Sequence, residues 1–197
     1  MVEMIKKTEA YFMKEFAEKA GKIAILSLFI LIPNFGGSMF FIFLFVTGLL
    51  ASDIHNKRFS TLITLPYSYK EIFFMSYFFM ISLITLLTTV SIGLYGFSSY
   101  EITLSYAAIT LLKSLIFATA YFSISMICVS FGLDNFITPL FILIADLILG
   151  GIGRTWQINP YKAISPVHQE IIWASLIFSV ILLIIAVIQF DKKGVQK

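Results

Sequence analysis

Residues 53–72 read DIHNKRFSTLITLPYSYKEI, and long apolar runs lie on both sides of this stretch. The stretch is basic and is interrupted by Pro66, yet it carries several apolar side chains before that proline. These are Phe59, Leu62, Ile63 and Leu65. Apolar side chains in a connection between membrane spans are costly to expose unless they bury against lipid headgroups or another protein. The stretch therefore predicts either an interfacial helix lying on a membrane or a docking helix for a soluble partner.

The composition of the whole chain indicates that its solvent is lipid. The chain has 197 residues, of which 59% are hydrophobic and 13% are charged, and its mean hydropathy is +0.94. A soluble domain of this size cannot bury so much apolar surface. One membrane span needs about 20 apolar residues, so there is room for five or six spans and no soluble catalytic domain. We expect an all-α integral membrane protein, with residues 1–197 forming a single transmembrane domain.

The apolar runs predict six transmembrane helices after a charged first segment. Residues 1–22 place charged and apolar side chains on opposite faces at helical spacing, which is typical of an amphipathic interfacial helix. Residues 23–52 are apolar but interrupted by PNFGGS at 33–38, so they form either two short spans or one broken span. We expect the later spans at 72–96, 103–131, 137–152 and 171–190, with 153–170 forming an outer re-entrant segment.

The positions of the basic residues predict which side each connection faces. The chain has fourteen lysines and arginines. All except Lys113, Arg154 and Lys162 lie in segments that six spans would place on one side of the membrane. Basic flanks face the cytoplasm. Both termini are therefore expected to be cytoplasmic, and residues 23–52 are expected to cross twice.

Residues that membrane enzymes require are missing from the sequence. The two histidines, His55 and His168, both lie in expected loops, so they do not suit haem ligation within the bilayer. No Walker A loop, zinc-binding HExxH pattern or GxSxG elbow is present. The single Cys128 lies within an apolar run and is expected to be a packing residue. We expect no catalytic residue, metal or cofactor on this chain.

Two charged residues, Lys113 and Asp146, lie inside expected spans. A charge near the centre of a bilayer costs about 2.5–3.5 kcal/mol on insertion scales, so such residues face a bundle interior, a partner or water. Two interpretations remain open. Either Lys113 and Asp146 form a structural ion pair, or Asp146 lines a cavity that faces substrate or a second subunit.

The order of residues in 53–72 resembles a motif of a known family. Asp53, Lys57 and Arg58 are followed by STL at 60–62, by LP at 65–66 and by Ser68 and EI at 71–72. This order is similar to the coupling segment of the membrane subunits of ABC-2 type ABC exporters. Ser60 stands where that family usually has glycine, and SY at 76–77 stands where glycine and lysine often follow. A shorter match, NPY at 159–161, falls in the outer segment, and the plan of spans agrees over nearly the whole chain.

The resemblance implies a permease subunit of an ATP-driven exporter, in which residues 53–71 form a cytoplasmic coupling segment. Such a subunit forms a homodimer, or a heterodimer with a similar permease, and docks a separate cytoplasmic ATPase subunit that holds ATP and Mg²⁺. The implied docking residues are Lys57, Arg58, Phe59, Thr61, Leu62, Leu65, Pro66, Tyr67, Ser68 and Glu71.

The expected location is the plasma (inner) membrane of a prokaryote, with lipid as solvent and no nucleic acid as partner. The alternative is a polytopic membrane protein that works without an ATPase, such as a small secondary transporter or a scaffold subunit of a larger complex.

Overall fold

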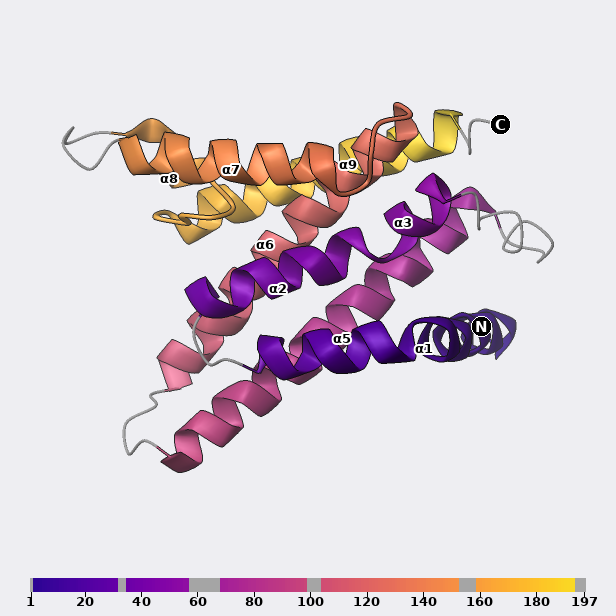
Figure 1. The fold of residues 1–197 in the computed structure, drawn as a ribbon, viewed down its shortest axis with the longest axis horizontal. Helices are drawn as coiled ribbons and strands as arrows, with labels where there is room; N and C mark the ends of the chain where they lie inside the picture. The colour runs from indigo at the N-terminus through magenta and orange to yellow at the C-terminus, as the bar shows by residue number, and fades with distance from the viewer. Residues whose placement is uncertain (1, 32–34, 57–67, 99–103, 153–158, 194–197) are drawn as a thin grey trace.

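The computed structural model describes residues 2–31, 35–56, 68–98, 104–152 and 159–193, and within these ranges the chain is helical and contains no strand. Figure 1 shows the helices packed side by side, with α6 passing behind α2 and α5 passing behind α1. In chain order they are α1 (Val2–Ile30), α2 (Phe35–Thr47), α3 (Leu50–His55), α5 (Tyr69–Ser98), α6 (Leu104–Ser130), α7 (Ile137–Ile152), α8 (Pro160–Ile164) and α9 (Ile172–Lys193). The predicted all-α class is confirmed.

Four stretches of the described chain are long and apolar enough to cross a membrane. They are Phe35–His55, Tyr69–Leu94, Ser105–Ser130 and Ile172–Lys192. The helix at Ile137–Gly151 is apolar but shorter, and α1 does not qualify. These findings agree with a multi-pass membrane protein. Crossings by α1 and α7, which six spans would require, remain a prediction.

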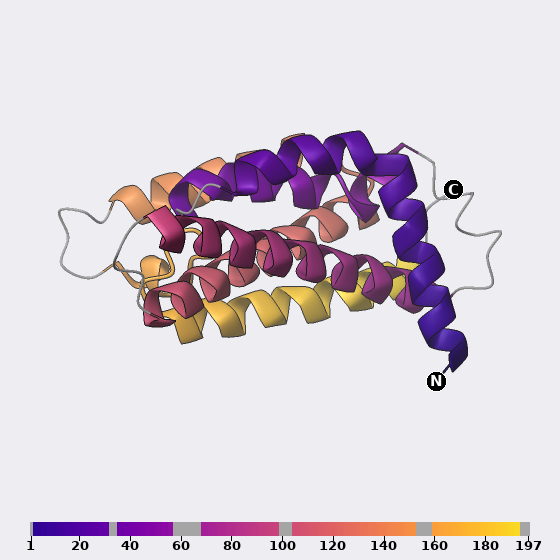
Figure 2. The ribbon, with the colours of Figure 1, turned by 90° about the horizontal axis from the view of Figure 1, so that it is seen from below.

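Residues 23–31 and 35–52 lie in two helical arms, and the expectation that each arm crosses the membrane stays a prediction. The Phe29 and Phe41 rings stack with their centroids 4.4 Å apart, and Lys19 contacts Asp53, so α1 and α2–α3 run antiparallel. Helix α1 does not end at residue 22 but continues to Ile30. Figure 2 shows that the N-terminal part of α1 lies across one end of the bundle, whereas its remainder runs along the bundle. One helix therefore provides both the predicted interfacial element and the first arm.

The core is centred on α6. Phe117, Tyr121 and Phe122 of this helix are fully buried. Phe122 packs against Phe73 of α5, and Tyr121 packs against Phe43 of α2. Because α6 is covered on several sides, residues near its middle must find their polar partners within the protein.

The turn between α6 and α7 follows from local sequence signals. Gly132 has a φ of 76° and ends α6, with its N–H bonded to the Val129 carbonyl and the Leu133 N–H bonded to the Cys128 carbonyl. This is a Schellman motif, in which glycine adopts the left-handed conformation without strain. Asp134 then accepts hydrogen bonds from the backbone N–H groups that begin α7. The turn falls between the apolar runs expected at 103–131 and 137–152.

The N-terminal part of α1 and the C-terminal end of α9 lie at the same end of the bundle (Figures 1 and 2). Ion pairs at this end agree with the pictures. Lys7 of α1 lies 3.9 Å from Glu71, and Lys70 lies 3.1 Å from Asp191 of α9. We call this the terminal end of the bundle, and the opposite end, which carries α8, the far end.

Candidate functional site

Most of the predicted docking residues lie outside the described part of the chain. These are Lys57, Arg58, Phe59, Thr61, Leu62, Leu65, Pro66 and Tyr67. The structure describes the two edges of the predicted coupling segment, namely residues 53–56 and 68–71. The candidate site is therefore built from the residues at these edges and from the helix that contacts them.

Ser68 and Glu71 form a capping box at the start of α5. The Ser68 backbone N–H donates to the Glu71 carboxylate at 2.7 Å, and the Glu71 N–H donates to the Ser68 hydroxyl at 3.2 Å. This reciprocal pair satisfies two N–H groups that have no partner within the helix. The capping box therefore fixes where α5, a helix long enough to cross a membrane, begins within the last residues of the predicted coupling segment.

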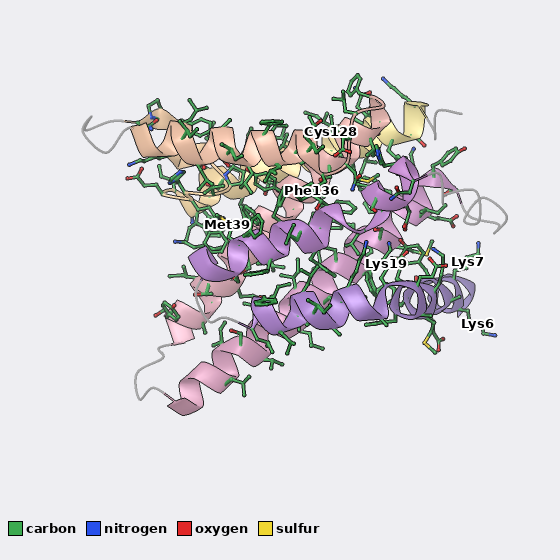
Figure 3. All side chains as sticks on the ribbon, viewed as in Figure 1. Lys6, Lys7, Lys19, Met39, Cys128 and Phe136 are labelled. Carbon is green, nitrogen blue, oxygen red and sulfur yellow. The ribbon has the colours of Figure 1, made fainter. Side chains whose placement is uncertain are left out.

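A buried charged group joins α1 to the start of the same segment. The Lys19 ammonium lies 2.7 Å from the Glu15 carboxylate and 2.7 Å from the Asp53 carboxylate. All three side chains are buried. We call Glu15, Lys19 and Asp53 the lysine cluster, and Figure 3 shows Lys19 on the α1 ribbon at this place, whereas Lys6 lies at the outer edge of the bundle. Lys14 extends the cluster, with its ammonium 3.5 Å from Glu15.

The sequence contains only part of the signal for the lysine cluster. Glu15 and Lys19 are four residues apart, so they face the same side of a helix and can pair. Lys19 also interrupts the apolar face of residues 1–22. These features indicate a local ion pair. They do not reveal that Asp53, which is 34 residues away, completes the cluster.

Helix α1 contacts both edges of the predicted coupling segment. Lys19 pairs with Asp53 at its first residue, and Lys7 lies 3.9 Å from Glu71 at its last. The first contact is buried, whereas the second is exposed and contributes little to stability. Helix α1 therefore contacts the segment through one buried ion pair and one weak, exposed contact.

A second cluster surrounds Asp146 near the far end of the bundle. The Asp146 carboxylate accepts hydrogen bonds from the hydroxyls of Tyr121 at 3.0 Å, Tyr161 at 2.8 Å and Ser165 at 2.6 Å. Asp146 is buried. Hydrogen bonds to an ionised acceptor are stronger than neutral ones, so three donors offset part of the cost of burying this carboxylate. We call these four residues the aspartate cluster.

The Lys113–Asp146 ion pair, one of the two interpretations from the sequence, does not form. The Asp146 carboxylate is bonded by the three hydroxyls of its cluster, and no carboxylate among the described residues pairs with Lys113. The Lys113 carbonyl instead accepts from the Gln169 side chain at 3.0 Å. The sequence was compatible with the ion pair because both residues lie inside expected spans. In the structure the hydroxyl groups of α6 and of residues 161–165 occupy the positions around the Asp146 carboxylate instead.

The described part of the outer segment packs against α7 through small and polar residues. Asn159 begins α8, accepting from the Tyr161 N–H while its own amide donates to the Leu149 carbonyl. Pro160 occupies the first turn, where its missing N–H is not needed. Further along, the His168 imidazole lies directly against Gly150, where a Cβ atom would collide with it. These contacts hold residues 159–168 onto the helix that carries Asp146.

Neither cluster has the composition of a metal centre. Among the described residues, no three His, Cys, Asp or Glu side chains are grouped so that they could hold a metal ion. The lysine cluster carries its own cation, and the aspartate cluster is bonded by hydroxyl donors. The chemistry of both is therefore that of ion pairing and hydrogen bonding.

Comparisons with known proteins return no relatives. No family model matches the chain, and no match is found among curated proteins or solved structures.

Proposed function

We propose that this chain is the permease subunit of an ATP-driven exporter of the ABC-2 type. In this proposal a separate cytoplasmic ATPase binds ATP and Mg²⁺ and docks on residues 53–71, and two permease subunits together form the substrate path. The chain itself is not an enzyme. The order of residues in 53–72 supports the proposal, as does the arrangement of helices before and after it.

The observation that carries the proposal is the double attachment of α1 to the coupling segment. Lys19 joins α1 to Asp53 through a buried contact of 2.7 Å, and Lys7 lies 3.9 Å from Glu71. An ATPase that pushes on residues 53–71 would therefore move α1, the end of α3 and the start of α5 together. Rigid-body displacement of packed helices is an established way to transmit a local event across a protein.

In this proposal the chain crosses the plasma membrane six times. The second half of α1 and the short helix α7 make the two crossings beyond the four long apolar stretches. The terminal end of the bundle then faces the cytoplasm, because the basic residues of α1, Lys70 and Lys192 gather there. Asp146 and α8 would lie on the outer side.

The test is purification of tagged protein from its native membrane in mild detergent, followed by identification of stoichiometric partners. We expect a soluble protein with a Walker A loop, lost when Leu65→Asp places a charge in the apolar part of the coupling segment. Leu133→Asp is the matched control, because Leu133 is an exposed leucine in the turn between α6 and α7, outside the segment. Its complex should remain intact.

A clean homomer without an ATPase would contradict the proposal. It would favour the alternative, a polytopic membrane protein such as a small secondary transporter or scaffold subunit. A complex that survives Leu65→Asp would show that the ATPase docks elsewhere.

A further inference from the structure

A cavity of about 320 Å³ lies between the N-terminal part of α1 and the first turns of α5. Lys7 and Thr8 line it from α1. Lys70, Glu71, Phe74, Met75 and Phe78 line it from α5. Lys7 and Glu71, which form the exposed contact between α1 and the coupling segment, both line this cavity, whereas no residue of the lysine cluster or the aspartate cluster does.

Charged and apolar groups are separated along the length of the cavity. Lys70 and Phe78 are eight residues apart on one helix, so they are separated by about 12 Å along its axis. The ammonium groups therefore lie at the terminal end of the bundle, and the aromatic rings lie deeper along α5. Phe74 and Phe78 remain 40% and 53% exposed, with ring centroids 6.4 Å apart. This is the polarity of a phospholipid, which has a charged head and an apolar tail.

The charge at the mouth of the cavity suits an anion. Lys70 contacts Asp191 at 3.1 Å, yet 57% of its side chain is exposed. Each ammonium carries three donor hydrogens, so Lys70 can bind a phosphate oxygen while keeping its carboxylate partner. The Glu71 carboxylate also lines the mouth, where it accepts from the Ser68 N–H and lies 3.9 Å from the Lys7 ammonium. Lys7, like Lys70, has three donor hydrogens and can therefore bind a phosphate oxygen beside its carboxylate partner. Lys6 directly precedes Lys7, and Lys192 directly follows Asp191. Both lysines are exposed and add positive charge at this end of the bundle.

We propose that this cavity binds an anionic phospholipid, with its phosphate between Lys7 and Lys70 and an acyl chain along Phe74 and Phe78. The two exposed rings have no role in binding free phosphate, so the chemistry favours a lipid over a soluble anion. Basic pockets between membrane helices bind acidic headgroups in this way. The site requires that the chain be embedded in a membrane, but it does not depend on an ATPase.

Native mass spectrometry of the purified protein tests the proposal. The probes are dioleoyl phosphatidylglycerol and dioleoyl phosphatidylcholine, added separately to the detergent-solubilised protein. We expect the wild-type protein to retain phosphatidylglycerol in preference. A basic side chain near an anionic surface contributes about 1 kcal/mol, so Lys7→Gln and Lys70→Gln should each weaken retention about fivefold. Lys6→Gln, which removes the same charge from an exposed position of α1 outside the cavity, should weaken retention less than either of these substitutions.

Phe78→Ser provides an independent test of the apolar part of the site. Because Phe78 is exposed, the fold should tolerate the substitution, and retention of phosphatidylglycerol should fall severalfold. Equal retention of the two lipids, or an equal effect of Lys6→Gln and Lys70→Gln, would overturn the proposal. Competition by inorganic phosphate with no effect of Phe78→Ser would show a simple anion site instead. Each of these outcomes is independent of whether an ATPase co-purifies.

Discussion

The Lys19 ammonium lies 2.7 Å from the Asp53 carboxylate, which joins two helices at residues 34 positions apart in the chain. Glu15 contacts the same ammonium at 2.7 Å, so one buried lysine pairs with two buried carboxyl groups. The contact ties the helix that lies across the bundle end to the residue that opens the predicted coupling segment. Its loss should therefore affect both stability and any motion that the two elements share.

Lys19→Met is expected to destabilise the protein strongly, because it leaves Glu15 and Asp53 buried without their shared cation. Removing one partner of a buried ion pair costs about 3–5 kcal/mol. Thermal unfolding in detergent micelles measures the change. Glu18→Gln is the control, because Glu18 pairs with Lys14 at 3.2 Å with half its side chain exposed, and such pairs contribute about 1 kcal/mol or less. Similar melting temperatures for the two variants would show that the lysine cluster is not a stabilising contact.

Asp146→Ala should destabilise the far end of the bundle, because it leaves the hydroxyls of Tyr121, Tyr161 and Ser165 without their acceptor. A buried polar group without a partner costs about 1–3 kcal/mol. Tyr161→Phe removes only one of the donors and should have a smaller effect. Ser82→Ala, at an exposed position of α5, serves as the control. The order of the three melting temperatures checks the prediction, and an unchanged Asp146→Ala protein would contradict it.

Gly150→Ala should be destabilising, because the added Cβ atom collides with the His168 imidazole. Overpacking of this kind typically costs about 1–3 kcal/mol. Gly151→Ala is the matched control, since nothing lies within 4 Å of its added Cβ and alanine favours the helix. His168→Ala should rescue Gly150→Ala in a double-mutant cycle of thermal stability. Equal effects of the two alanine substitutions would show that residues 150 and 168 are not packed together.

Asp134 should make stability depend on pH in the acidic range. The Ile137 backbone N–H holds the pKa of Asp134 below its ordinary value of 3.8, with further contributions from the Phe136 N–H and from His55. A lowered folded-state pKa means that the stabilisation is present above the unfolded value and is lost as the pH falls through the folded value. The melting temperature of the wild-type protein should therefore drop below about pH 4.

Asp134→Asn removes the charge of this side chain but keeps its ability to cap the start of α7. Asparagine also caps helices, so this variant should keep most of the stability at neutral pH while losing part of the acid dependence. A melting temperature that falls with the same slope in both proteins would show that Asp134 does not contribute to it.

The positions of the helices could be predicted because the signals for them are local. The apolar run at 137–152 corresponds to Ile137–Ile152, and the run at 171–190 corresponds to Ile172–Lys193. Gly132 and Asp134 mark the turn before α7 by their own conformational preferences, and Ser68 with Glu71 marks the start of α5 in the same way. The change of direction within α1 could not be predicted from the sequence. The helix continues through residue 22, and the packing of neighbouring helices determines the direction of each half.

The sequence by itself determined that the chain is helical and apolar enough for lipid. It also determined, to within a few residues, where α5, α6, α7 and α9 begin and end, because hydropathy and capping act over short distances along the chain. Only the tertiary structure decided the partners of the buried charges. Lys113 was available to Asp146 by depth, yet the hydroxyls of Tyr121, Tyr161 and Ser165 bind that carboxylate, and Lys19 reaches Asp53 across the hairpin. A charge removed from water must be neutralised by whichever group the packing brings within about 3 Å, and that group is set by contacts between distant segments.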